Sequence, residues 1–144
     1  MSLALHDVVP HIITQSLHLR VKESESHLAK RLLQQYRNEA DPAARRAQVK
    51  ALWIENGSHY VRTREVHGHA DLEVRVATSH QTNVAERNYW FEVDGGVEQL
   101  RDMVKFNWRM VGKGGGAIAA TGLIVALLAD DGRIRIDYQF IDPD

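Results

Sequence analysis

The chain has no cysteine among its 144 residues. It can therefore form neither a disulfide nor a thiolate metal site, and this composition is typical of the reducing cytoplasm, where we expect the protein to reside. An excess of charge of one sign is also lacking, since 18 basic residues face 19 acidic ones. A chain with this balance has no general attraction to nucleic acid or to an acidic membrane, so we expect neither as a partner.

Long apolar runs are absent as well. The longest, residues 117–129, is interrupted by Thr121 and Gly122 and is shorter than the roughly 20 residues that a membrane helix needs. It predicts a buried strand instead. Near the N-terminus, Asp7 and Pro10 interrupt the apolar residues, so the pattern does not match a signal peptide and secretion is not expected.

The composition that remains is that of an ordinary globular chain, with 44% hydrophobic and 26% charged residues. Its length suits one domain. We predict an N-terminal extension over residues 1–22 and a single domain over residues 23–144.

The helical signals lie in the first half of the domain. Apolar residues recur with helical spacing from Ser24 to Ala40, with charged residues such as Arg37 expected on the solvent face. Asp41-Pro42 is a start signal for a second helix, which should run to about Trp53. A third helix is predicted over residues 69–81.

Strand signals fill the second half. A short strand is expected at 58–63, and beyond residue 86 the hydrophobic period changes to two. The predicted strands are separated by a hairpin turn at 94–96, a flexible glycine-rich loop at 112–116 and a hairpin turn at 130–132. Helices followed by hairpin-linked strands predict an α+β fold, in which helices cover one face of an antiparallel sheet.

Three segments, residues 51–61, 65–72 and 129–143, resemble in order and spacing the nuclear-transport-factor-two-like superfamily, especially its SnoaL-like branch. The similarity extends over residues 28–143. It implies a cone-shaped curved antiparallel sheet packed against three N-terminal helices, a pocket inside the cone and a homodimer formed through the outer face of the sheet. The superfamily includes ketosteroid isomerases, polyketide cyclases, dehydratases and noncatalytic binders, so the fold alone does not specify a reaction.

The same resemblance allows the residues of ketosteroid isomerases to be sought here. The position of their tyrosine corresponds to Leu33, that of their aspartate base to Arg62, and that of their protonated acid to Ile124. None of these three side chains can take over the corresponding role. Ketosteroid-type proton transfer is therefore not expected, and the loss of the acid at Ile124 also weakens a cyclase assignment.

Other polar groups can still reach the predicted pocket. Strand alternation directs Asp137 and Gln139 inward, on a different strand from Ile124. Because a buried carboxylate needs a partner, we hypothesise an ion pair between Arg62 and Asp137 with Gln139 beside it. The alternative is that twist or a bulge turns Asp137 to solvent, next to an arginine of the same strand.

Aromatic residues offer apolar walls for a ligand site or, alternatively, ordinary core packing. The candidates are Trp53, Tyr60, Trp90 and Trp108, which we group with Arg62, Gln139, Leu33 and Ile124 as predicted ligand-binding residues. Trp90 or Trp108 can instead pack in a dimer interface.

Histidines provide the remaining chemical candidates. His67 and His69, with His59 and His80, form a weak metal-binding pattern that fits a turn better, so no metal is expected. His80 lies on the apolar side of the predicted third helix and is, with Asp137, our candidate catalytic acid or base.

From these residues we expect a domain that binds a small apolar molecule, with isomerase, cyclase or dehydratase-like chemistry if Asp137 or His80 is tuned for proton transfer. Such chemistry needs no cofactor. The alternative is a noncatalytic dimerisation or protein-interaction module of the same fold, and the sequence leaves open whether the protein is an enzyme.

Overall fold

The computed structural model of the chain describes residues 27–143, so the predicted extension over residues 1–22 lies outside the described residues. Residues 27–30 are helical and continue into a π-helical segment, η1. In chain order the elements are η1 (Arg31–Tyr36), α2 (Pro42–Leu52), β1 (Trp53–Val61), β2 (Arg64–His67), α3 (Gly68–Ser79), η2 (His80–Glu86), β3 (Tyr89–Leu100), β4 (Met103–Gly112), β5 (Ile118–Leu128) and β6 (Ile134–Ile141).

The second helix begins as its sequence predicts. The side chain of Asp41 caps α2 by accepting a hydrogen bond from the backbone N–H of Ala44, and Pro42 occupies the first turn, where no N–H is needed. The third helix also begins close to its expected position, but it continues beyond Ser79 as the π-helical segment η2.

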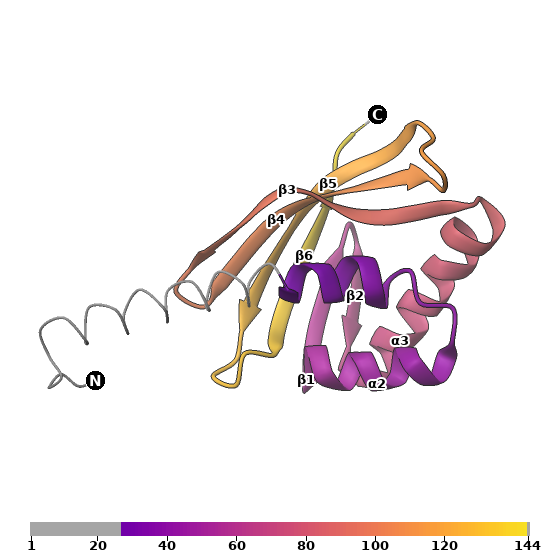
Figure 1. The fold of residues 1–144 in the computed structure, drawn as a ribbon. Coiled ribbons are helices and arrows are strands. Elements are labelled where there is room, and N and C mark those ends of the chain that lie inside the picture. Colours follow the sequence, from indigo (N-terminus) through magenta and orange to yellow (C-terminus); the bar gives the residue numbers. More distant parts are fainter. Residues whose placement is uncertain (1–26, 144) are drawn as a thin grey trace, which may run out of the picture.

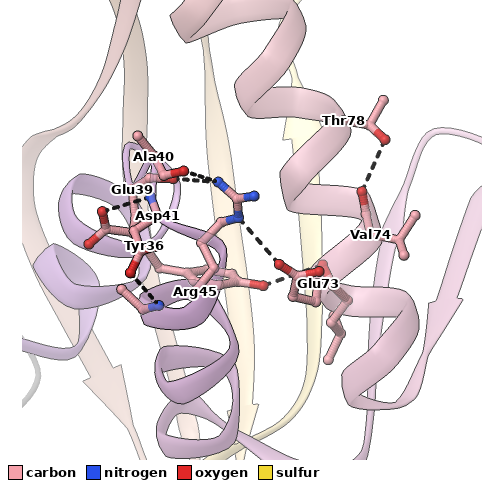
Figure 2. Close-up of polar contacts among 10 residues, drawn as sticks. Tyr36, Glu39, Ala40, Asp41, Arg45, Glu73, Val74 and Thr78 are labelled. Carbon is pink, nitrogen blue, oxygen red and sulfur yellow. Dashed lines mark hydrogen bonds and ion pairs between the residues drawn. The ribbon is translucent and has the colours of Figure 1, made fainter.

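Arg45 joins the helices to one another (Figure 2). Its guanidinium donates to the backbone carbonyls of Glu39 and Ala40 at 2.8 and 3.2 Å and pairs with the carboxylate of Glu73 on α3 at 3.4 Å. This buried side chain holds the loop before α2 against α3, which fixes the position of α3 over the sheet.

All six strands form one curved sheet in the order β2-β1-β6-β5-β4-β3, with the helices on one side of it (Figure 1). The meander predicted for the last four strands is confirmed. The sheet is mixed, however, because β1 pairs with β6 in parallel, whereas a purely antiparallel sheet was expected. These two strands come from opposite ends of the domain, so no hairpin constrains their relative direction.

The predicted turn at 94–96 is wrong. β3 runs through this segment, and a register shift between Asp94 and Val97 places the two glycines in a bulge. The hairpin instead turns after Leu100, where Arg101 adopts a left-handed conformation with φ of 55°. Glycine pairs suit a bulge as well as a turn, so their presence alone did not locate the hairpin.

The core lies between the helices and the inner face of the sheet. On β4 the period-two pattern places Val104, Phe106 and Trp108 in the core. Trp108 donates its indole N–H to the backbone carbonyl of Phe140 at 3.2 Å, across Gly122 of the intervening strand. A Cβ on Gly122 would collide with both groups, so this close approach requires glycine.

Within the described part of the chain, no helix is long and apolar enough to cross a membrane.

Candidate functional site

Asp137 lies on the inner face of β6 and is completely buried, with 0% of its surface exposed. The inward orientation expected from strand alternation is therefore found for both Asp137 and Gln139. Ile134 is buried as well, although it lies an odd number of residues before Asp137, because a register shift near the start of β6 interrupts the alternation. Because an unpaired carboxylate in this interior would be strongly destabilising, its partners define the site.

Two N–H groups from β1 face the carboxylate of Asp137. His59 is its register partner on the parallel strand, and Nδ1 of His59 lies 2.8 Å from Oδ2. Trp53 donates its indole N–H to Oδ1 at 3.3 Å. The carboxylate thus accepts one hydrogen bond on each oxygen, so neither of these buried acceptors lacks a partner.

The position of Asp137 sets the tautomer of His59. Since Nδ1 faces a carboxylate, the ring proton resides there, and Nε2 carries a free lone pair. Nε2 is buried and has no hydrogen-bond partner among the described residues. Burial lowers the pKa of His59, and this effect exceeds the opposing attraction of Asp137. The pair therefore has the geometry of an oriented, unprotonated base.

Arg37 is the buried cation beside this pair. It follows directly after η1, donates to Oε1 of Gln139 at 2.9 Å and is only 3% exposed. Burial lowers the pKa of its guanidinium, whereas the charge of Asp137 opposes this change. Arg37 was expected on the solvent face of the first helix, and that expectation is wrong.

The hypothesised pair between Arg62 and Asp137 is not formed. Arg62 is exposed in the turn between β1 and β2, where it has a φ of 53°. Asp137 is bonded by His59 and Trp53 instead. The turn carries Arg62 off the strand face, whereas Arg37, which follows η1, reaches Gln139 on β6.

Tyr36 supports the wall of the site. Its ring meets that of Trp53 edge-on, with centroids 5.5 Å apart, and its hydroxyl donates to the carbonyl of Leu72 at 3.3 Å. Burial raises the pKa of the phenol, which therefore stays protonated. The contact limits the movement of Trp53, one of the two donors to Asp137.

A hollow of about 360 Å³ extends the inner face of β1 and β6 beyond the buried pair. Val61 and Ile141 form its apolar wall, two residues along their strands from His59 and Gln139 respectively. The rest of the lining comes from the β1–β2 turn, β2, α3 and η2, and consists of Arg62, Thr63, Arg64, Arg75, Thr78, Ser79, Thr82 and Asn83.

Most residues predicted to bind a ligand belong to the packed core. Leu33 and Ile124 are fully buried at 0% exposed, and Trp53 and Trp108 are similarly covered. The core-packing alternative therefore holds for the two tryptophans, and Leu33 and Ile124 lie in the same core. Of the predicted ligand-binding group, Arg62 lines the hollow described above.

The other two aromatic candidates lie elsewhere. Tyr60 is on the outer face of the sheet, where it stacks on Tyr138 with ring centroids 5.4 Å apart, so its assignment to the pocket is wrong. Trp90 is partly buried, and the ammonium group of Lys113 lies 5.5 Å from its ring centroid. The glycine-rich loop thus contacts the edge strand rather than the Asp137 site.

The remaining histidines are separate from Asp137. Burial lowers the pKa of His80, and the positive charges of Arg45 and Lys113 lower it further.

The other two histidines make local hydrogen bonds. His67 bonds to Ser58, and His69 bonds to the carbonyl of Trp53. Among residues 27–143, no cluster of three His, Asp or Glu side chains is arranged to hold a metal ion.

Comparisons with known proteins agree with this architecture. No family model matches the sequence, and no curated protein matches it. A candidate isomerase of the SnoaL-like family from Agrobacterium tumefaciens superposes with a TM-score of 0.75 at 24% identity, over 84% of this chain and 99% of that one. An NTF2-like protein of unknown function from Exiguobacterium gives 0.62 at 20% identity, over 83% and 99%. The chain has an NTF2-like, SnoaL-like fold.

This NTF2-like fold does not by itself specify a reaction. A de novo designed protein with a curved β-sheet superposes with a TM-score of 0.64 at 11% identity, over 85% of this chain and 88% of that one. Because unrelated sequences share the framework, function must be argued from the side chains around Asp137 and the adjoining hollow.

Proposed function

We propose that this chain is a small-molecule binding domain in which His59 acts as a general base for proton transfer of the isomerase type. The observation that supports this is the buried, unpartnered Nε2 of His59, with Nδ1 oriented by Asp137 at 2.8 Å. A neutral imidazole with a lowered pKa accepts a proton without first losing one. Asp137 is then a positioning residue rather than the base that the sequence suggested.

The surrounding charges support carbanion chemistry. Proton abstraction next to a carbonyl places negative charge on the substrate, and Arg37 and Arg75 are both close enough to act electrostatically on His59. A ligand in the hollow would contact Val61, which lies on the same strand face as His59. The structural similarity to a candidate isomerase agrees with this reaction class.

The experiment combines a ligand screen with proton exchange. Ligands that raise the thermal unfolding temperature are selected first, because binding to the native state stabilises it. Enzyme-dependent deuterium incorporation into these ligands is then followed by NMR for wild type, His59→Asn and the exposed control His27→Asn. Asparagine can place an amide N–H where Nδ1 lies, so it keeps the bond to Asp137 but removes Nε2.

We expect His59→Asn to bind ligand and to lose at least about a hundredfold in exchange rate, the lower range for general base catalysis. His27→Asn should exchange as wild type does. Equal exchange by wild type and His59→Asn would contradict the proposed role and favour a noncatalytic binder.

We also propose that the domain forms a homodimer through the outer face of its sheet. Tyr138 and Phe140 on β6 are 38% and 55% exposed on this face, and Tyr60 extends the apolar surface onto β1. Exposed aromatic side chains on one sheet face are typical of an interface. A noncatalytic interaction module would use the same surface, so the dimer is compatible with either function.

A further inference from the structure

The hollow beside the buried pair is lined by three arginines that come from different elements. Arg62 lies in the turn after β1, Arg64 lies on β2 and Arg75 lies on α3. The described residues that line the hollow include no aspartate or glutamate. Hydroxyl and amide side chains complete the wall, so its hydrogen-bonding groups suit an acceptor-rich ligand.

These arginines are not neutralised by ion pairs within residues 27–143. Glu73, by contrast, pairs with Arg45, and Glu65 pairs with His67. Arg64 and Arg75 also border a second hollow that contains Glu65 and Asp71, yet no ion pair within 4.0 Å joins either arginine to either acid. Positive charge is therefore concentrated where the lining contains no carboxylate.

Arg75 is the most constrained of the three. Its Nε atom is buried and has no hydrogen-bond partner in the described part of the chain. Burial, followed by repulsion from Arg37 and Arg64, lowers its pKa to about 10. An anion in the hollow would supply both an acceptor for the unpartnered N–H group and a negative charge that offsets the repulsion from the other arginines.

We propose that this hollow binds the oxyanion group of a small molecule, a carboxylate or a phosphate, through Arg62, Arg64 and Arg75. As a description of the substrate, this inference rests on the proposed function: the anionic group would be held by the arginines, and the carbon skeleton would extend along Val61 toward Nε2 of His59. The apolar ligand expected from the sequence is thereby replaced by a small organic acid or phosphate ester.

Calorimetric titration of the full chain tests the anion site directly. Inorganic phosphate and succinate are the two anionic probes, and succinamide is the uncharged analogue of succinate, all at one ionic strength set with sodium chloride. The variants are Arg75→Gln, the double variant of Arg62→Gln with Arg64→Gln, and Arg46→Gln as an exposed arginine on α2 outside the hollow.

We expect wild type to bind at least one of the two anions and not succinamide. Arg75→Gln should weaken that binding about tenfold or more, because a charge-assisted and partly buried contact is lost, whereas Arg46→Gln should match wild type. The anion that binds with the higher affinity shows whether the ligand's anionic group is a phosphate or a carboxylate. If Arg75→Gln does not fold, the exposed double variant gives the same comparison.

Absence of binding by both anions, or unchanged affinity in Arg75→Gln and in the double variant, would overturn the inference. The experiments also distinguish a wrong anion site from a wrong assignment of His59 as the base. His59→Asn should keep wild-type affinity for the anion, so anion binding without His59-dependent exchange would contradict the proposed function alone. Exchange that depends on His59, without anion binding, would contradict the anion site alone.

Discussion

Nδ1 of His59 and Oδ2 of Asp137 are 2.8 Å apart across two parallel strands whose residues are register partners. The hydrogen-bond ladder between β1 and β6 therefore fixes their relative position, although 78 residues separate them in the chain. Both side chains are almost completely buried, at 1% and 0% exposed. The strands thus provide a rigid support for the proposed base.

Asp137→Asn should destabilise the protein by about 3 kcal/mol, because it leaves Arg37 as a buried cation without its nearby anion. Urea unfolding measures this change. Asp102→Asn is the matched control, since Asp102 pairs with Arg135 at the surface with 61% of its side chain exposed. The control should change stability by less than about 1 kcal/mol. Similar losses in the two variants would contradict the electrostatic role of Asp137.

The stability of the fold should fall on the acid side because of His59. Its folded-state pKa lies below the ordinary value of 6.5, so as the pH drops below 6.5 the unfolded chain takes up a proton that the folded chain does not. The free energy of unfolding therefore decreases through that range until the lowered pKa is reached. His59→Asn should show a shallower decrease in urea unfolding across the same pH series, and identical slopes would show that His59 does not contribute.

Gly122→Ala should cost about 1 to 3 kcal/mol, the range for overpacking a core, because the new methyl group meets Trp108 and the Phe140 carbonyl. Gly96→Ala is its control, since no atom lies within 4 Å of a Cβ at that bulge position. Thermal unfolding of the two variants gives the comparison. A wild-type melting temperature for Gly122→Ala would show that the strands are not packed as closely as described.

Phe140→Lys should convert the proposed homodimer into a monomer. The ring is 55% exposed, so the substitution places a charge in the interface without disturbing the core. Light scattering after size-exclusion chromatography measures the mass. Val74→Lys, at a 61% exposed position on α3, should leave the mass unchanged. A monomeric wild type, or a Phe140→Lys variant that remains dimeric, would contradict this interface.

Local residue patterns in the sequence predict much of the framework. Period-two alternation places Asp137 and Gln139 inward, and the cap at Asp41-Pro42 locates the start of α2. The glycines at 94–96 mislead, since a bulge and a turn favour the same residues. The two correct predictions and the wrong one all rest on local residue patterns, which can be read from a single sequence.

The partners of the site depend on contacts between distant segments. Alternation from Val61 places His59 on the inner face, but its pairing with Asp137 requires the parallel register of β1 and β6. Arg37 lies four residues after the buried Leu33, a spacing that could have revealed it. Its charge instead favoured assignment to solvent, as for most arginines.

The protonation of His59 most directly tests its assignment as the base. Nitrogen-detected NMR of the wild-type chain at pH 7 distinguishes the two neutral tautomers from the imidazolium. We predict a neutral ring with the proton on Nδ1, changing to the other tautomer in Asp137→Asn, where the amide N–H can face that nitrogen. A wild-type ring protonated on Nε2, whether neutral or as the imidazolium, would contradict the assignment of His59 as the base.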